Sequence, residues 1–161
     1  MMRDRSTSVK GGSEPPAIDE RLDNVLFNVW LVSRATNGLL DRALRPAGLD
    51  GDEFALYSLL LADDGATPSD LARWMAAPPT TVSSYVKRLE RRGHAEREAN
   101  PDDRRSYRLR LTAAGRAAHA EAGALFLPAL AAVRAGLGRD EGAVTEALHA
   151  VRQALYAAGH P

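Results

Sequence analysis

An alternating segment beside a turn restricts the fold of this chain more than any other feature. From Ser106 to Leu111 the residues run Ser-Tyr-Arg-Leu-Arg-Leu, and a period of two is typical of a β-strand with one buried face. The segment 94–100, HAEREAN, alternates more loosely. Residues 100–103 between them, Asn-Pro-Asp-Asp, are turn-forming types. Residues 94–111 are therefore predicted to form a β-hairpin with a charged tip.

Two helices are predicted directly before this hairpin. Thr67 and Asp70 have the spacing of a capping box, with Pro68 suited to the first turn of a short helix. The apolar face expected for that helix is Leu71, Trp74 and Met75. Pro78-Pro79 ends it and opens a second helix over residues 80–93, which Gly93 terminates. The apolar stripe of the second helix is Val82, Val86 and Leu89, with Tyr85 beside it.

Helices are also predicted on both flanks. Residues 18–45 have apolar residues at helical spacing, and Pro46 and Gly48 stop the helix. A capping box at residues 50 and 53 starts a helix that is apolar nearly all round and is expected at the centre of the core. After the hairpin, Thr112 caps a long helix that we expect to be interrupted at Pro128 and to end near Gly136 or Gly138. Residues 139–158 form the last helix, and residues 1–17 form a polar tail.

Composition limits the classes of function. The 161 residues include no cysteine, which excludes a disulfide framework, a cysteine-based zinc site and a thiol switch. No apolar run approaches the length of a membrane span, and the first residues lack the apolar core of a signal peptide. A cytoplasmic protein without a membrane partner is therefore the simplest interpretation. Formal net charge is zero, but residues 73–112 have 10 basic and 5 acidic residues. This basic segment favours a polyanionic partner, although solvated surface arginines are the alternative.

The order of elements predicts a mainly α fold with a small β-hairpin, a winged helix-turn-helix. Two helices joined by a tight turn, the second with small polar and basic residues outside, suit the DNA major groove, and the following hairpin would be the wing. The long helices at both ends have large apolar faces without an internal partner, which favours a homodimer. The predicted layout is a single domain over 18–161, with dimerisation helices at 18–46 and 112–158 and a DNA-binding lobe at 47–111.

The segments VKRLERRGHAER, Val86 to Arg97, and DDRRSYRLRLTAAG, Asp102 to Gly115, resemble the MarR (multiple antibiotic resistance regulator) family of bacterial transcription factors. The resemblance extends over residues 18–158. It implies a winged helix-turn-helix homodimer that binds a pseudo-palindromic DNA site, usually as a repressor. It also implies a wing whose Asp-x-Arg motif, counted back from Thr112, is Asp103 and Arg105, with Arg105 in the minor groove and Asp103 holding its guanidinium.

The DNA-binding residues expected from this pattern lie on the second helix and at the wing tip. They are Thr80, Thr81, Ser83, Ser84, Lys87, Arg88, Asp103, Arg104 and Arg105. Thr80 and Thr81 sit where helix N–H groups and hydroxyls can hold phosphate. Ser84 departs from the family, in which many relatives have a longer side chain near this position, so specificity would depend more on Lys87 and on DNA shape.

Other functions are less well supported by the sequence. Relatives commonly bind a small aromatic or phenolic effector, and five residues are candidates to line such a cleft, although each also fits ordinary core packing: Trp30, Phe54, Tyr57, Trp74 and His119. No cofactor or metal is implied. Catalysis is not indicated, because no His-Glu-x-x-His, phosphate-binding loop or nucleophile elbow is present, and Glu146 with His149 is a simple i,i+3 pair. A winged-helix module that binds protein rather than DNA is the remaining alternative.

Overall fold

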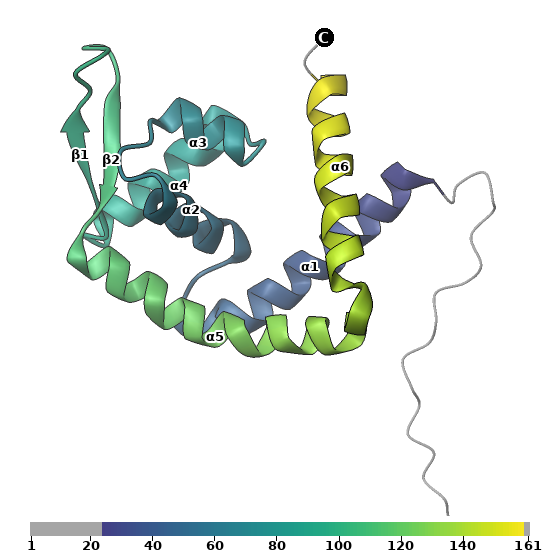
Figure 1. The fold of residues 1–161 in the computed structure, drawn as a ribbon. Helices are drawn as coiled ribbons and strands as arrows, with labels where there is room; N and C mark the ends of the chain where they lie inside the picture. Colours follow the sequence, from purple (N-terminus) through teal and green to yellow (C-terminus); the bar gives the residue numbers. More distant parts are fainter. Residues whose placement is uncertain (1–23, 160–161) are drawn as a thin grey trace, which may run out of the picture. The chain divides into compact units, whose positions relative to one another are not determined.

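The computed structural model describes residues 24–159, which are mostly helical with one antiparallel hairpin (Figure 1). This confirms the predicted fold class. The predicted tail, residues 1–17, and the first residues of the predicted first helix lie outside the described residues. The elements in chain order are α1 (Val25–Leu44), the 3-10 helix η1 (Arg45–Ala47), α2 (Gly51–Ala62), α3 (Pro68–Trp74), α4 (Pro79–Arg91), β1 (Ala95–Ala99), β2 (Tyr107–Leu111), α5 (Ala113–Leu137), the 3-10 helix η2 (Gly138–Asp140) and α6 (Glu141–Gly159).

Three helices begin at side-chain caps that the sequence predicts. The carboxylate of Asp50 accepts the amide of Glu53 at 2.7 Å, in a complete capping box. The Thr67 hydroxyl accepts the amide of Asp70 at 3.2 Å, in a second complete box. At the start of α5, the hydroxyl of Thr112 accepts the Gly115 amide at 3.1 Å. Each cap satisfies an N–H that would otherwise lack a partner and so fixes where its helix starts.

The core forms around α2, as expected from its apolar sequence. Leu56, Tyr57 and Leu60 are fully buried. The other buried members of the cluster are Leu44, Leu49, Ala66, Leu71, Val82, Val86, Leu89, Ala95, Leu109, Leu111 and Ala122. Because this cluster includes the stripe of α4 and the inner face of β2, one core holds the helix-turn-helix and the hairpin together.

The hairpin is anchored at its base. In the antiparallel register Ala95 lies opposite Leu111 and Ala99 opposite Tyr107. Leu109 donates its amide to the carbonyl of Ala66 at 3.0 Å, so β2 is also held by the loop before α3. These contacts leave the segment between the strands as a projecting tip, as the alternation predicts.

Two sequence predictions are wrong in this part of the fold. The first is the interruption at Pro128: α5 is continuous from Ala113 to Leu137 and ends, as predicted, at Gly138. A proline removes one backbone hydrogen bond and crowds the preceding turn, but the long helical segments on both sides maintain the helix. The second is the burial of Trp74, which is 36% exposed at the end of α3.

The described residues divide into two units between Ala35 and Thr36, within α1, and α1 therefore contributes to both. By length and composition alone, one described stretch would be able to cross a membrane. It is Ala113–Gly159, whose most apolar window has a mean hydropathy of 1.4. The expectation of no such run is therefore not met, although a single stretch of this kind is weak evidence for a span.

Candidate nucleic-acid interface

The helix α4 has one apolar and one polar side. Val82, Val86 and Leu89 are buried, whereas the exposed side has small polar and cationic groups. The residues on that polar side are Thr80, Thr81, Ser83, Ser84 and Lys87. Thr81 and Ser83 are half-buried and the other three are exposed. No side chain caps the first turn of α4, where Pro78 is the N-cap residue. Pro78 and Pro79 have no N–H and the Thr81 amide donates to the Pro78 carbonyl at 2.9 Å, so the Thr80 amide and the threonine hydroxyls are the groups of this turn that suit an anion.

A further cation of α4 was missed by the sequence interpretation. Arg91 is exposed and lies four residues after Lys87 and seven after Ser84, which places all three along one face. They line a shallow depression of about 410 Å³ together with Thr81. The i, i+3, i+7 spacing of Ser84, Lys87 and Arg91 was the signal that would have identified Arg91.

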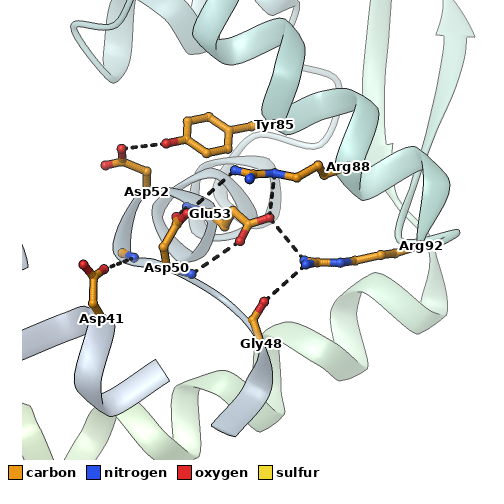
Figure 2. Close-up of polar contacts among 9 residues, drawn as sticks. Asp41, Gly48, Asp50, Asp52, Glu53, Tyr85, Arg88 and Arg92 are labelled. Carbon is orange, nitrogen blue, oxygen red and sulfur yellow. Dashed lines mark hydrogen bonds and ion pairs between the residues drawn. The ribbon is translucent and has the colours of Figure 1, made fainter. Parts of the chain in front are cut away.

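Arg88 lies on the side of α4 that faces α2, unlike the neighbouring candidates (Figure 2). Its Nε is 3.1 Å from Oε1 of Glu53 and its Nη2 is 3.7 Å from Oδ2 of Asp50. The guanidinium also lies over the ring of Tyr85, 4.6 Å from the ring centroid. Arg88 is therefore held by acids of the protein, so it is a weaker candidate for DNA contact than the sequence indicates.

At the wing tip, Arg104 and Arg105 are exposed. The resemblance implied that Asp103 holds the guanidinium of Arg105. In the described residues Asp103 instead accepts the backbone N–H of Arg105 at 2.9 Å and so shapes the turn. The ion pair of the tip joins Arg108 to Asp102 at 2.6 Å. Within residues 24–159, neither Arg104 nor Arg105 has an ion-pair partner, and both guanidinium groups remain available to an external anion.

The wing base contains a second ion-pair cluster. Arg110 donates to Asp64 at 2.8 Å and to Glu98 at 2.9 Å. The hydrogen bond from Arg110 holds the pKa of Asp64 below its ordinary value, against a smaller opposing effect of desolvation. This cluster connects β2 to β1 and to the loop after α2, and so restrains the direction of the wing.

The four candidate effector residues within the Thr36–Pro161 unit do not line one pocket. Phe54 and His119 stack with ring centroids 5.2 Å apart, and His119 Nε2 is 3.0 Å from the hydroxyl oxygen of Ser58. Burial lowers the pKa of His119. Tyr57 is elsewhere in the core, where its hydroxyl lies 2.7 Å from Nδ1 of His94 and burial raises its pKa. Trp30 belongs to the Met1–Ala35 unit and is exposed.

Trp74 borders a groove of about 720 Å³ between the α3–α4 turn and α6. The hydroxyl of Tyr156, on α6, lies 3.2 Å from the carbonyl oxygens of both Arg73 and Trp74. Ala76, in the turn, has a left-handed backbone with φ of 48°, which is unfavourable for a residue with a Cβ. The groove is thus lined in part by a strained turn, which is followed directly by α4.

The described residues include no group of three or more histidine, cysteine or acidic side chains placed to hold a metal ion. Glu146 and His149 are exposed on α6. The features that the geometry of the described residues does assemble are a polar face on α4 and a hairpin tip with two unpaired guanidinium groups. A helix-turn-helix followed by such a hairpin defines a winged-helix DNA-binding protein.

Comparison with known proteins gives the family. The family model described as MarR family matches residues 47–106. The HTH-type transcriptional repressor Rv2887 of Mycobacterium tuberculosis is 33% identical over 121 residues, 75% of this chain and 85% of that repressor, and the Mycobacterium bovis repressor Mb2911 matches equally. A crystal structure of the M. tuberculosis regulator MosR in complex with DNA is 29% identical, with a TM-score of 0.73 over 84% of this chain and 98% of MosR.

The chain therefore belongs to the MarR family of DNA-binding transcriptional regulators. The sequence resemblance is confirmed. The family and the two repressors above are regulators of transcription rather than enzymes.

Proposed function

We propose that this protein is a homodimeric repressor that binds a pseudo-palindromic operator, with α4 in the major groove and the wing tip in the minor groove. The observation that carries the proposal is the pair of unpaired guanidinium groups at the hairpin tip, on the same lobe as an exposed polar helix face. The names of the mycobacterial relatives support repression, and the DNA in the MosR crystal supports the partner. A regulator of bacterial DNA would act in the cytoplasm.

The side chains divide into positioning and reading groups. Thr80 and Thr81 at the open end of α4 are suited to phosphate, as is Arg104. Lys87 is the longest side chain of the predicted reading face, and Ser83 and Ser84 are too short to span far into a groove. Arg105 has the charge and low hydration that the narrow minor groove favours. Specificity would then depend on Lys87 and on DNA shape.

The test is selection of bound fragments from the source genome by the wild type and by Arg105→Ala. Arg139→Ala is the matched control, because Arg139 is an exposed arginine in η2, outside the winged lobe. We expect the wild type and the control to enrich one palindrome with half-sites about one helical turn apart, and the Arg105 variant to bind it much less. Enrichment of nothing at low salt would favour the protein-binding alternative.

The homodimer rests on apolar side chains that the single chain leaves exposed. In α5 and α6 these are Leu127, Val133, Leu148 and Leu155, exposed by 41–59%. Exposed apolar patches of this kind are typical of association surfaces. Leu148→Glu should give monomers in analytical ultracentrifugation and should weaken operator binding. Gln153→Glu, an exposed polar position of the same helix, adds the same charge and should leave the dimer intact.

An aromatic or phenolic effector would fit the groove beside Trp74 better than the surroundings of Phe54, Tyr57 and His119. Its volume is within the usual range for small-molecule sites, and Arg152 at its edge has no ion-pair partner among residues 24–159. A ligand that favours an arrangement in which Tyr156 leaves the turn would change the setting of α4, and so the DNA affinity. Titration of aromatic acids and phenols against the protein–operator complex tests this, and Arg152→Ala should weaken any release that is found.

A further inference from the structure

Glu53 is the buried ionic residue of the described chain, with only 3% of its surface exposed. Two arginines lie close to its Oε1: Arg88 of α4, with Nε at 3.1 Å, and Arg92 at the C-cap of α4, with Nη1 at 3.2 Å (Figure 2). A buried carboxylate is costly unless it is paired. Two guanidinium groups four residues apart supply that pairing from one side of α4.

The same carboxylate is fixed from the α2 side. Its Oε2 accepts the amide of Asp50 at 3.4 Å within the capping box, and Glu53 donates its own amide back to Asp50. Arg92 also donates from Nη2 to the carbonyl of Gly48 at 3.2 Å. One network therefore joins α4 to the first turn of α2 and to the loop before it.

The remaining attachments of α4 are mostly apolar, with two further polar contacts: the hydroxyl of Tyr85 donates to Oδ2 of Asp52 at 2.8 Å (Figure 2), and Glu90 accepts from Arg97 of β1 at 2.9 Å. Val82, Val86 and Leu89 pack into the core, and apolar burial holds a helix without setting its rotation closely. The contacts of Arg88 and Arg92 with Glu53, on two successive turns of α4, depend on the direction and distance of each guanidinium and so restrict the rotation of the helix. Nε of Arg88 is buried and has no hydrogen-bond partner among the described residues, so its pairing with Glu53 is electrostatic. The side-chain hydrogen bonds from α4 and its C-cap to Glu53 and Gly48 come from Arg92.

We propose that Glu53 is a positioning residue for DNA recognition, which sets the rotation of α4 by holding Arg88 and Arg92. The proposal rests on the proposed function of α4 as the reading helix. Base reading requires that Lys87 faces the groove at a fixed angle, whereas electrostatic binding to any duplex does not. We call the contacts of Glu53 with Arg88 and Arg92 the clamp. Loss of the clamp therefore lowers affinity for the operator more than affinity for unrelated DNA.

The experiment uses Glu53→Gln, which keeps the shape and removes the charge. Affinities for the selected operator and for a scrambled duplex of equal length are measured at one salt concentration. Hydrogen exchange of the α4 amides is measured without DNA. Glu146→Gln is the control, because it removes one exposed acid of α6, outside the winged lobe. Arg92→Gln is the second variant, which keeps the test valid if Glu53→Gln does not fold.

We expect Glu53→Gln and Arg92→Gln to lower the operator-to-scrambled affinity ratio about tenfold, the effect of roughly one mismatched base pair, and to speed exchange in α4. Scrambled-duplex affinity should be unchanged or higher in Glu53→Gln, since two arginines are released. A folded variant whose ratio equals that of wild type overturns the proposal. So does equal weakening on both duplexes, which would make Arg92 a phosphate contact.

Failure of the proposed function is distinguishable from failure of the clamp. If the wild type does not prefer any duplex, the DNA-reading role fails. Hydrogen exchange then decides on the clamp: unchanged exchange in α4 of Glu53→Gln rejects it, and faster exchange relative to Glu146→Gln retains it as a device that orients α4.

Discussion

Gly115→Ala should be among the most destabilising single-methyl additions in this protein. Gly115 is buried in the first turn of α5, where a Cβ would overlap the carbonyl oxygen of His94 and lie 2.9 Å from its carbonyl carbon. The backbone of His94 cannot easily move, because its N–H donates to Leu89 at 2.9 Å and its carbonyl accepts from Thr112 at 3.0 Å. The clash therefore strains the junction of α4, the wing and α5 together.

The magnitude follows from this rigidity. Overpacking costs about 1–3 kcal/mol where neighbours can adjust and more where they are backbone, so we expect a loss of at least about 3 kcal/mol. For a chain of this size that corresponds to a fall in Tm of about 6–12 °C. The assay is thermal and urea unfolding followed by circular dichroism.

The control is Gly123→Ala in the same helix. A Cβ at Gly123 meets nothing within 4 Å, so the substitution should gain helix propensity, about 0.8–1 kcal/mol. The two variants should thus shift Tm in opposite directions. Wild-type stability in Gly115→Ala would refute the argument that this close approach requires glycine.

Two further predictions concern stability. Burial lowers the pKa of His119, so the unfolded chain binds a proton more readily than the folded one. The free energy of unfolding should fall as pH drops below about 6.5, and His119→Gln should flatten that part of a pH series of urea titrations. Thr67→Ala removes the cap of α3 and should cost about 1 kcal/mol in the same titrations, whereas Thr145→Ala, in the exposed interior of α6, should cost less.

The local features of this fold could be read from the sequence because they depend on neighbouring residues. The capping boxes at Asp50 and Thr67 involve partners three residues apart, and the alternation from Ser106 to Leu111 marks a strand by itself. Features that depend on distant partners could not be read in this way. Nothing near Tyr57 in sequence indicates the hydrogen-bond contact with His94, 37 residues away.

The same distinction separates the candidate DNA-binding arginines. Helix periodicity predicts that Arg88 is an exposed, unpaired cation. Its acidic partners are 35 and 38 residues earlier in the sequence, in α2 and at its N-cap. Arg91 has the same chemistry three residues later and no such partner among residues 24–159. Charge in a sequence therefore shows how many cations are present, whereas ion pairing in the fold decides which of them are available to DNA.

This pairing sets the expected salt dependence of DNA binding. Of the 10 basic residues in 73–112, six have ion pairs: Arg73, Arg88, Arg92, Arg97, Arg108 and Arg110. The four without a partner in the described chain are Lys87, Arg91, Arg104 and Arg105. If each of the four neutralises one phosphate charge, wherever in the grooves it binds, the two subunits of a dimer neutralise about eight, and log K against log salt should have a slope of about −7, since each neutralised charge contributes about −0.9.

The count of all ten cations would instead predict a slope of about −18. Fluorescence anisotropy with a labelled operator over a range of salt concentrations separates the two values. A slope much steeper than −7 would mean that DNA breaks the internal ion pairs, and that arginines held by acids in the free protein are released on binding. A slope near −7 would mean that the acids of this chain, Glu53 among them, keep their arginines while DNA is bound.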